Sequence, residues 1–282
     1  MRSTIHRSIR VTVLAAGIVA MASTAHAEEG KGRNTATVAL GAALLPTYSG
    51  SDDYVVTPGL VIQAQLAGFQ IFSRGTYLMM DVIRDDGDAG MSLDIGPVAG
   101  VRLERSGRIG DSQVRALGEL DAAWEIGGWA GVSRTGVLTS SYDRLSVRTY
   151  YVADVGSAHK SYVITPEIEY GMPLSQRTLI GLSLSADYVG KGYGRHYFDV
   201  TPAGSLASGL AAYAGGGKAG FAKIKTGLLV AQSLSGDLRK GWALVAGAGY
   251  GRILGRYARS PIVKDAGSRN QWLGTLGIAY SF

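Results

Sequence analysis

The end of the chain constrains its fold most strongly, because apolar side chains occupy alternate positions there. Over residues 271–282, one set of alternate positions is mostly large and apolar, and the other set is mostly small or polar. A period of two residues is typical of a β-strand with one apolar face. Aromatic side chains stand at both ends of this face, as in the strands of membrane barrels. The face consists of Trp272, Gly274, Leu276, Ile278, Tyr280 and Phe282.

The same alternation recurs at 54–66, 91–104, 114–126, 162–170 and 180–188. On the polar faces of most of these segments, acidic or basic side chains oppose the apolar set. Charges of both signs in succession are expected for an interior that is wet or crossed by salt bridges. The candidates for lining this interior are Asp94, Arg102, Arg115, Glu119, Asp121, Glu125, Glu167, Glu169 and Asp187.

Alternation is also found in soluble sandwiches, so the fold class needs a second argument. Tyrosine and tryptophan bound the apolar faces, which favours contact with lipid headgroups. No run of 18 apolar residues lies beyond the first thirty positions, which disfavours a helical membrane protein. Since lipid cannot hydrogen-bond a backbone, strands cross a membrane only in a closed barrel. The sequence predicts an all-β, antiparallel up-and-down transmembrane barrel of about 12 strands, with 10 or 14 as alternatives.

Strands are predicted at 35–45, 54–66, 69–82, 90–104, 113–126, 128–139, 144–155, 160–171, 178–189, 221–233, 240–251 and 270–282. An even number of strands places both ends of the barrel domain on the periplasmic side. The short connections 67–68, 105–112, 172–177 and 234–239 are then expected in the periplasm. Connections 46–53, 83–89, 190–220 and 252–269 are expected outside, and the last two are long.

The first 27 residues have the pattern of a secretory signal peptide. A basic segment precedes a short apolar stretch at 11–21, and Ala25 and Ala27 form a small-x-small cleavage signature. We expect Sec-type export, cleavage after Ala27, and one barrel domain at 28–282 in the outer membrane of a Gram-negative bacterium. Cleavage removes three arginines and lowers the formal net charge from +6 to +3. A nucleic-acid partner therefore has little support.

The mature chain shows little sign of catalytic chemistry. It has no cysteine, which excludes disulfides and cysteine-based zinc sites, and it keeps only two histidines, His159 and His196. Neither belongs to an H-E-x-x-H motif, and no G-x-S-x-G elbow is present. The glycine run 215–217 departs from a phosphate-binding loop on both sides. We predict no catalytic residue, metal or cofactor.

Two charged groups in the connections allow a binding role. The acidic segments 52–53 and 85–88 suit a divalent cation, although solvated turns are the favoured interpretation. The connection 252–269 is basic, and attraction to anionic headgroups and simple solvation both remain open for it.

Four segments carry a family resemblance: 46–54 (PTYSGSDDY), 190–200 (GKGYGRHYFDV), 207–217 (ASGLAAYAGGG) and 260–271 (SPIVKDAGSRNQ). Together they resemble the MipA/OmpV family of outer-membrane proteins, whose eponym is the MltA-interacting protein. The resemblance implies an outer-membrane barrel. For the best-known member it implies a scaffold that joins a lytic murein transglycosylase to a bifunctional murein synthase. This chain departs from the family pattern at Asp199, usually glycine, and at Arg256, usually acidic.

Three functions follow as hypotheses. The first is a non-enzymatic scaffold for murein enzymes, in contact with outer-membrane lipid and lipopolysaccharide. The second is a narrow channel lined by the charged residues named above, and the third is a lipid-modifying enzyme that uses His159 or His196. Independently of function, the face formed by Trp272, Leu276, Ile278, Tyr280 and Phe282 resembles the C-terminal signal that the barrel-assembly machinery reads.

Overall fold

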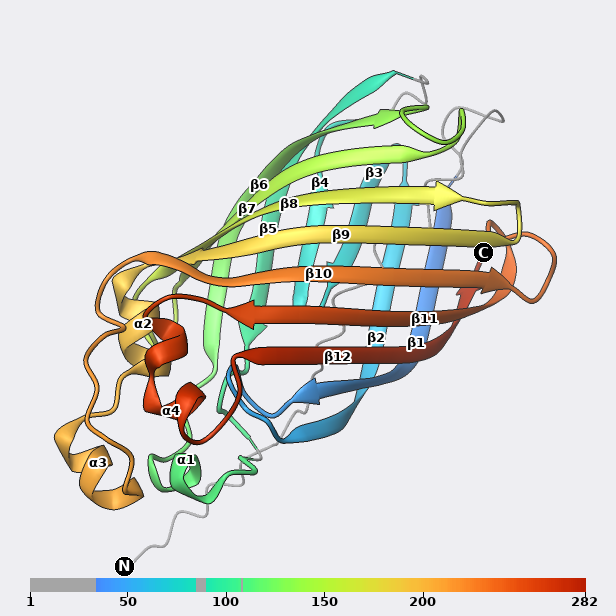
Figure 1. Cartoon of the computed structure of the whole chain (residues 1–282). Helices are drawn as coiled ribbons and strands as arrows, with labels where there is room; N and C mark the ends of the chain where they lie inside the picture. Colours follow the sequence, from blue (N-terminus) through green and yellow to red (C-terminus); the bar gives the residue numbers. More distant parts are fainter. Residues whose placement is uncertain (1–33, 85–89, 108) are drawn as a thin grey trace, which may run out of the picture.

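The computed structural model describes residues 34–84, 90–107 and 109–282, which form a closed antiparallel β-barrel (Figure 1). Each strand pairs with the next one along the chain, and β12 returns to β1 with Thr37 opposite Ser281. Gly41 faces Gly277 in this closing pair, and a Cβ atom on Gly41 would collide with the backbone carbonyl of Leu276. Closure pairs the backbone of every strand, as a lipid environment requires.

The predicted barrel of 12 antiparallel strands is confirmed. The signal peptide predicted at 1–27 lies outside the described residues. The strands are β1 (Thr35–Pro46), β2 (Tyr54–Leu66), β3 (Phe69–Arg74), β4 (Tyr77–Asp81), β5 (Met91–Arg102), β6 (Ala123–Thr135), β7 (Arg144–Asp154), β8 (Tyr162–Pro173), β9 (Thr178–Val189), β10 (Gly220–Ser233), β11 (Gly241–Ile253) and β12 (Asn270–Ser281). The helices are α1 (Ser112–Ala116), α2 (Lys191–Phe198), α3 (Pro202–Ser208) and α4 (Pro261–Lys264), and η1 (Tyr257–Arg259) is a 3₁₀ turn.

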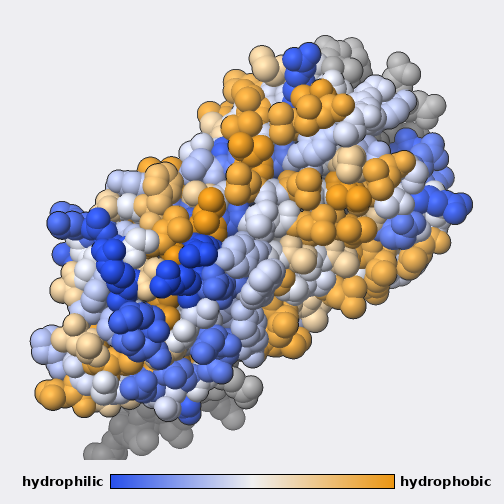
Figure 2. Space-filling model, in the orientation of Figure 1, coloured by the Kyte–Doolittle hydropathy of each residue, from blue (hydrophilic) through white to orange (hydrophobic). Residues whose placement is uncertain are grey.

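The outer face of the barrel is apolar, and Figure 2 shows hydrophobic residues spread over the strands. Leu93, Trp272 and Leu276 are each more than half exposed, whereas their sequence neighbours Asp94 and Gln271 are buried. Successive side chains of a strand point to opposite sides, so the buried set faces the interior. No helix within the described ranges is both long and apolar enough to span a membrane.

One predicted strand, 69–82, is in fact two. The chain turns at Gly75 and Thr76, where Gly75 has a φ of 60°, and β3 and β4 pair with Arg74 opposite Tyr77. A left-handed φ suits glycine, which lacks the Cβ that makes this conformation costly. The sequence pattern does not reveal this turn, because apolar residues continue on both sides of it.

A second prediction, a strand at 113–126, is wrong over most of its length. The side chain of Asp111 accepts a hydrogen bond from the Val114 amide and starts α1, and Gly118 follows it with a φ of 88°. Regular pairing begins only at Ala123, and β6 then runs unbroken through Gly127 and Gly128 to Thr135. The first part of the predicted segment 128–139, up to Thr135, therefore belongs to the same strand, and 136–139 lie in the turn that follows it. One strand was missed and one invented, so the total of 12 is correct although these boundaries were not.

The corrected strand order moves two connections to the opposite side. The termini of the barrel and the short 67–68 turn mark the periplasmic end. Residues 105–112, expected in the periplasm, belong to the long outer connection between β5 and β6. The connection that includes 83–89, expected outside, leaves β4 and enters β5 at the periplasmic end. Residues 85–89 of it, with the acidic segment 85–88, lie outside the described residues.

The outer end of the barrel is closed by a folded cap. We use "outer cap" for the connections 47–53, 103–122, 190–219 and 254–269, which carry all four helices (Figure 1). Its own apolar cluster draws on every one of these connections. The Tyr48 hydroxyl donates to the Ala266 carbonyl at 3.0 Å, and the buried Ser260 hydroxyl donates to the Phe198 carbonyl at 2.5 Å. The cluster consists of Tyr48, Ile109, Val114, Val200, Leu210, Ile262 and Ala266.

Candidate functional site

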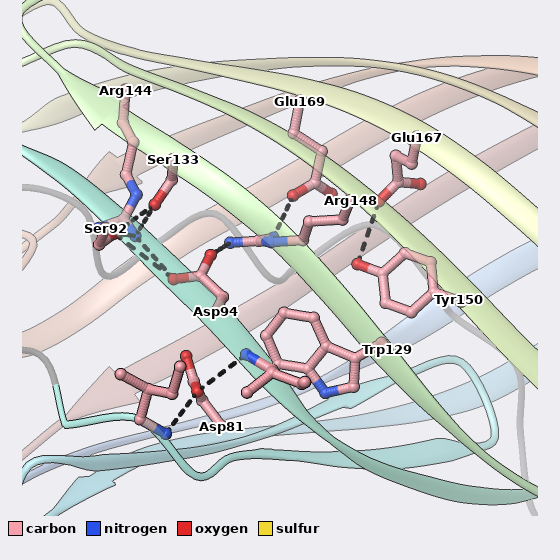
Figure 3. Close-up of polar contacts among 12 residues, drawn as sticks. Asp81, Ser92, Asp94, Trp129, Ser133, Arg144, Arg148, Tyr150, Glu167 and Glu169 are labelled. Atoms are coloured by element: carbon pink, nitrogen blue, oxygen red, sulfur yellow. Dashed lines mark hydrogen bonds and ion pairs between the residues drawn. The ribbon is translucent and has the colours of Figure 1, made fainter.

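Ion pairs run through the interior of the barrel, as Figure 3 shows. Arg148 on β7 donates from Nη1 to Glu169 Oε2 at 2.7 Å and reaches Asp94 Oδ2 with Nη2 at 3.5 Å. Arg144, four residues before Arg148 on the same face of β7, lies 3.8 Å from the other oxygen of Asp94. All four side chains are at least 85% buried. Burying a single unpaired charge in the interior of a protein costs much free energy. These four charged side chains can therefore be buried only because each one is paired with an opposite charge.

A second ion pair crosses the lumen. Arg74 on β3 binds both carboxylate oxygens of Glu167 on β8, and four strands lie between β3 and β8 on the shorter way around the barrel. Arg74 also lies 3.7 Å from Glu169 and donates to the Tyr150 hydroxyl at 3.2 Å. The Glu167 side chain is fully buried. The pair therefore ties opposite walls together through the interior.

Aromatic rings fill the space around these charges. Arg148 lies 5.6 Å from the centre of the Trp129 ring, and Arg74 lies 5.1 Å from the centre of the Tyr150 ring. Trp129 stacks on Tyr150 and meets Phe72 edge-on, and its indole N–H donates to the Met80 carbonyl. Such cation–π contacts stabilise a desolvated cation by about 1–2 kcal/mol. The interior at these strands is packed with side chains.

Nearer the outer end, Glu125 collects three partners. It receives two hydrogen bonds of 3.0 Å from Arg102, one of 2.8 Å from His159 Nε2, and one from the Tyr77 hydroxyl. Glu125 and His159 have fully buried side chains. His159 belongs to the outer connection 155–161, so this cluster fastens that connection to the barrel wall.

Helix α2 of the outer cap packs onto the Glu125 cluster. Tyr193 lies under the Arg102 guanidinium at 5.3 Å and meets the His159 ring edge-on. Burial, with the charge of Arg105 nearby, lowers the pKa of His196, so this imidazole is neutral at pH 7. Burial raises the pKa of Tyr197, which keeps the phenol protonated. Residues of α2 and of β3–β8 thus share one buried cluster, and the helix closes the mouth of the barrel on that side.

The remaining candidate lining residues are distributed unequally. Asp187 on β9 accepts hydrogen bonds from Lys225 at 2.7 Å and from Thr165 at 2.9 Å. Arg115, Glu119 and Asp121, by contrast, are exposed in α1 and the segment after it. They were expected on a strand, and the helical turn in their place puts them in the outer cap instead. Six candidates lie on strands, namely Asp94, Arg102, Glu125, Glu167, Glu169 and Asp187.

Sequence reasoning missed several residues that complete these contacts: Arg74, Tyr77, Arg144, Arg148 and Tyr150. It considered His159 only as a candidate for catalysis and not as a partner of the interior charges. Arg144, Arg148 and Tyr150 share one parity of β7, and Ser146 lies between them. That alternation was a usable signal for an inward polar face. Arg74 and Tyr77 flank the overlooked turn at 75–76, so an error in strand boundaries concealed both.

The periplasmic end is closed differently. Leu238, in the turn between β10 and β11, is buried among small residues of β1, β11 and β12, and its amide donates to the Gln176 carbonyl. The turn 136–143 is built around Asp143, which is fully buried. Its carboxylate accepts hydrogen bonds from four consecutive amides, Val137 to Ser140, and from the Tyr170 hydroxyl. Although burial alone opposes it, these donors hold the pKa of Asp143 well below its usual range.

The C-terminal face lies where the alternation placed it. Trp272, Leu276, Ile278 and Phe282 are exposed on the outside of the barrel. Tyr280 meets Trp242 and Phe282 edge-on, with ring centres 4.8 Å apart in both pairs. The Phe282 amide donates to the Ala36 carbonyl of β1, so the last residue also joins the closing strand pair. Recognition by the assembly machinery stays a prediction.

The two histidines that the sequence analysis singled out lie near each other at the outer end of the barrel. His159 is held by Glu125, and its ring centre lies 6.5 Å from that of His196. Among the described residues, His159 Nδ1 and His196 Nε2 have no hydrogen-bond partner, and no three potential metal ligands converge.

Comparison with solved structures gives outer-membrane barrels at low identity. OmpT of Vibrio cholerae is 7% identical, with 90% of this chain and 99% of that chain covered and a TM-score of 0.35. An outer-membrane channel from Pseudomonas putida F1 is 10% identical over 92% and 98% of the two chains, with a TM-score of 0.40. An anion-selective porin from Comamonas acidovorans is 10% identical over 89% and 99%, with a TM-score of 0.36.

The comparison with curated proteins gave no match. The model of the family described as MltA-interacting protein MipA matches residues 38–282, which is the barrel from β1 to the last residue. That range includes all four segments on which the resemblance rested. This protein is an outer-membrane β-barrel. The chain belongs to the MltA-interacting protein MipA family.

Proposed function

We propose that this barrel is a non-enzymatic scaffold whose periplasmic end holds a lytic murein transglycosylase and a bifunctional murein synthase together. The observation that carries the proposal is the filled interior. Arg74 and Glu167 join opposite walls, and α2 packs over the mouth. With the interior filled in this way, the protein would act through its surfaces and not through a pore. The family description, which names an interaction with MltA, also supports a role in binding other proteins.

The periplasmic turns offer a rigid apolar surface for such partners. Leu138 stands 71% exposed in the turn that Asp143 fixes, and Leu174 and Leu234 are 57% and 65% exposed in the next two periplasmic connections. Exposed apolar side chains on a fixed backbone make effective anchors, because little conformational freedom is lost on binding. We expect Leu138 to be one of the anchors.

The test is binding of the purified barrel in nanodiscs to a purified lytic murein transglycosylase from the same organism, followed by biolayer interferometry. The wild-type barrel should bind saturably, and Leu138→Ser should weaken binding about tenfold. Leu206→Ser is the matched control, because Leu206 is 90% exposed in α3 at the opposite end.

The scaffold also requires simultaneous binding. Addition of the synthase to the barrel–transglycosylase complex should give a second, additive signal. No saturable binding of either enzyme to the wild-type barrel, or mutually exclusive binding of the two, would contradict the proposal. If Leu138→Ser and Leu206→Ser weakened binding of the transglycosylase equally, the periplasmic turn would not be part of the binding surface.

A further inference from the structure

Charge is divided unequally over the outer cap. The connections 190–219 and 254–269, with Arg252 at the end of β11, hold eight lysines and arginines against two aspartates. The connections 47–53 and 103–122 hold six acidic residues against three arginines. Figure 2 shows strongly hydrophilic residues gathered at the end of the molecule that carries α2 and α4, beside the apolar surface of the strands. The basic side is formed by Lys191, Arg195, Lys218, Arg252, Arg256, Arg259, Lys264 and Arg269.

The arginines on this side lack internal partners. In the described part of the chain, Arg252, Arg256, Arg259 and Arg269 make no ion pair, and Lys264 makes one of 3.9 Å with Asp265. The interior arginines Arg74, Arg102, Arg144 and Arg148 all face carboxylates. The basic side of the cap is therefore available to an external anion.

Aromatic side chains on the strands indicate at which level of the membrane the basic side of the cap lies. On the outer face of β11 and β12, Tyr250 lies against Trp272 at the outer end, with ring centres 4.9 Å apart, and Trp242 lies against Tyr280 at the periplasmic end. Trp242 and Tyr250 are eight residues apart on β11. At about 3.4 Å per residue and a tilt of about 40°, they are separated by about 21 Å along the membrane normal, close to the apolar band of about 25 Å in such barrels.

Arg252 lies on the same parity of β11 as Tyr250, two residues beyond it, and is exposed. The two residues add about 7 Å along the strand, or about 5 Å along the membrane normal. This is the level of the lipid headgroups. Arg252 is paired in register with Asn270, whose side chain also accepts a hydrogen bond from the Tyr250 hydroxyl at 2.8 Å. Arg269, next to Asn270, is exposed at the same level, where its carbonyl accepts from the Ile253 amide.

From this geometry we infer a binding site for a phosphorylated glycolipid of the outer leaflet, with its phosphates on Arg252 and Arg269 and its acyl chains along Tyr250 and Trp272. Guanidinium groups bind phosphate in a bidentate manner. An apolar strand face directly below the cations matches an amphiphile, whereas a soluble anion would use the cations alone. Arg256, directly before the neighbouring 3₁₀ turn, and Arg259, at its end, add to the positive potential.

The test measures binding of fluorescent lipid A to the folded full-length barrel in detergent micelles. The probes are diphosphorylated lipid A, the same lipid without phosphates, and inorganic phosphate as a competitor. Each basic residue near a lipid surface contributes a factor of about five, so Arg252→Gln/Arg269→Gln should weaken binding of diphosphorylated lipid A about 25-fold. The dephosphorylated lipid should bind the wild-type and variant barrels equally.

The matched control is Arg134→Gln/Lys240→Gln, which removes two exposed charges at the periplasmic end. It should change the affinity less than twofold, and heat-modifiable electrophoretic mobility should show that both variants are folded. Equal losses for the two double variants would overturn the site, as would equal binding of both lipids by the wild-type barrel. Displacement by millimolar inorganic phosphate would instead assign a free-anion site and overturn the lipid assignment.

Discussion

The pair formed by Arg74 and Glu167 makes a quantitative prediction about stability. Replacing Arg74 by methionine keeps most of the side-chain volume but leaves the fully buried Glu167 with the Tyr150 hydroxyl, 3.4 Å away, as its hydrogen-bond partner. The carboxylate then either stays charged without compensation or takes up a proton. Glutamic acid has an ordinary pKa of about 4.3, so protonation at pH 7 costs about 3.7 kcal/mol, which caps the penalty.

The same reasoning predicts how the loss of stability depends on pH and on which of the two residues is replaced. At pH 5, protonation costs only about 1 kcal/mol, so most of the loss in Arg74→Met should disappear. Glu167→Gln should cost less, about 1–2 kcal/mol, because Arg74 is 20% exposed and has Glu169 at 3.7 Å as a second partner. The double variant Arg74→Met/Glu167→Gln should resemble Glu167→Gln, so the coupling energy should equal the Arg74→Met loss, at most about 3.7 kcal/mol at pH 7.

The assay is equilibrium unfolding in urea of the barrel in phospholipid vesicles, followed by tryptophan fluorescence at pH 7 and pH 5. Trp129 packs beside Tyr150 and reports on this part of the interior. Arg134→Met, which changes an exposed arginine at the end of β6, is the control and should change stability by less than about 0.5 kcal/mol. A loss below about 1 kcal/mol for Arg74→Met at pH 7, or an equal loss at both pH values, would refute the argument.

Four further outcomes are expected. Asp143→Ala should destabilise the barrel by about 2–3 kcal/mol in the same assay, because four turn amides and the Tyr170 hydroxyl lose a charged acceptor. Since the native pKa of Asp143 is depressed, its contribution to the free energy of unfolding should be complete above the unfolded pKa of about 3.9 and should decline as the pH falls below that value. If stability fell with pH between 5 and 3 as steeply in Asp143→Asn as in the wild type, this prediction would be contradicted. Deletion of Phe282 should lower membrane insertion but not secretion, and a normal heat-modifiable barrel in the outer membrane would refute the assembly signal. Planar bilayers holding the folded wild-type barrel should stay electrically silent, whereas steady openings would favour the channel hypothesis.

The fold was readable from the sequence because the outward pattern is a property of each strand alone. Lipid contact demands an apolar residue at every second position, and β12 shows this over its whole length. The predicted strand boundaries were wrong where the same alternation occurred outside a strand. Around α1, charged and apolar residues alternate over a few positions, but a side-chain cap at Asp111 and a left-handed Gly118 favour a helical turn.

The interior contacts were less predictable, because they depend on which strands face each other after closure. Asp94 and Glu169 were recognisable as inward charges from their own strands. Their shared partner Arg148 lies on β7, and the contact requires the curvature that brings β5, β7 and β8 around one point. Arg74 and Glu167 are 93 positions apart in the sequence, and no local pattern relates them.

Closure of the barrel through β1 and β12 also has a kinetic consequence. β1 is the first strand of the domain to be made, yet one of its two partners is the last strand, some 240 residues later. Contacts of such long sequence separation form slowly, and an unpaired apolar strand edge invites aggregation during the delay. The chain must therefore travel through the periplasm with both edges of its nascent sheet unsatisfied. Escorting factors that cover Thr35–Pro46 until Asn270–Ser281 arrives would keep this edge from aggregating during the delay.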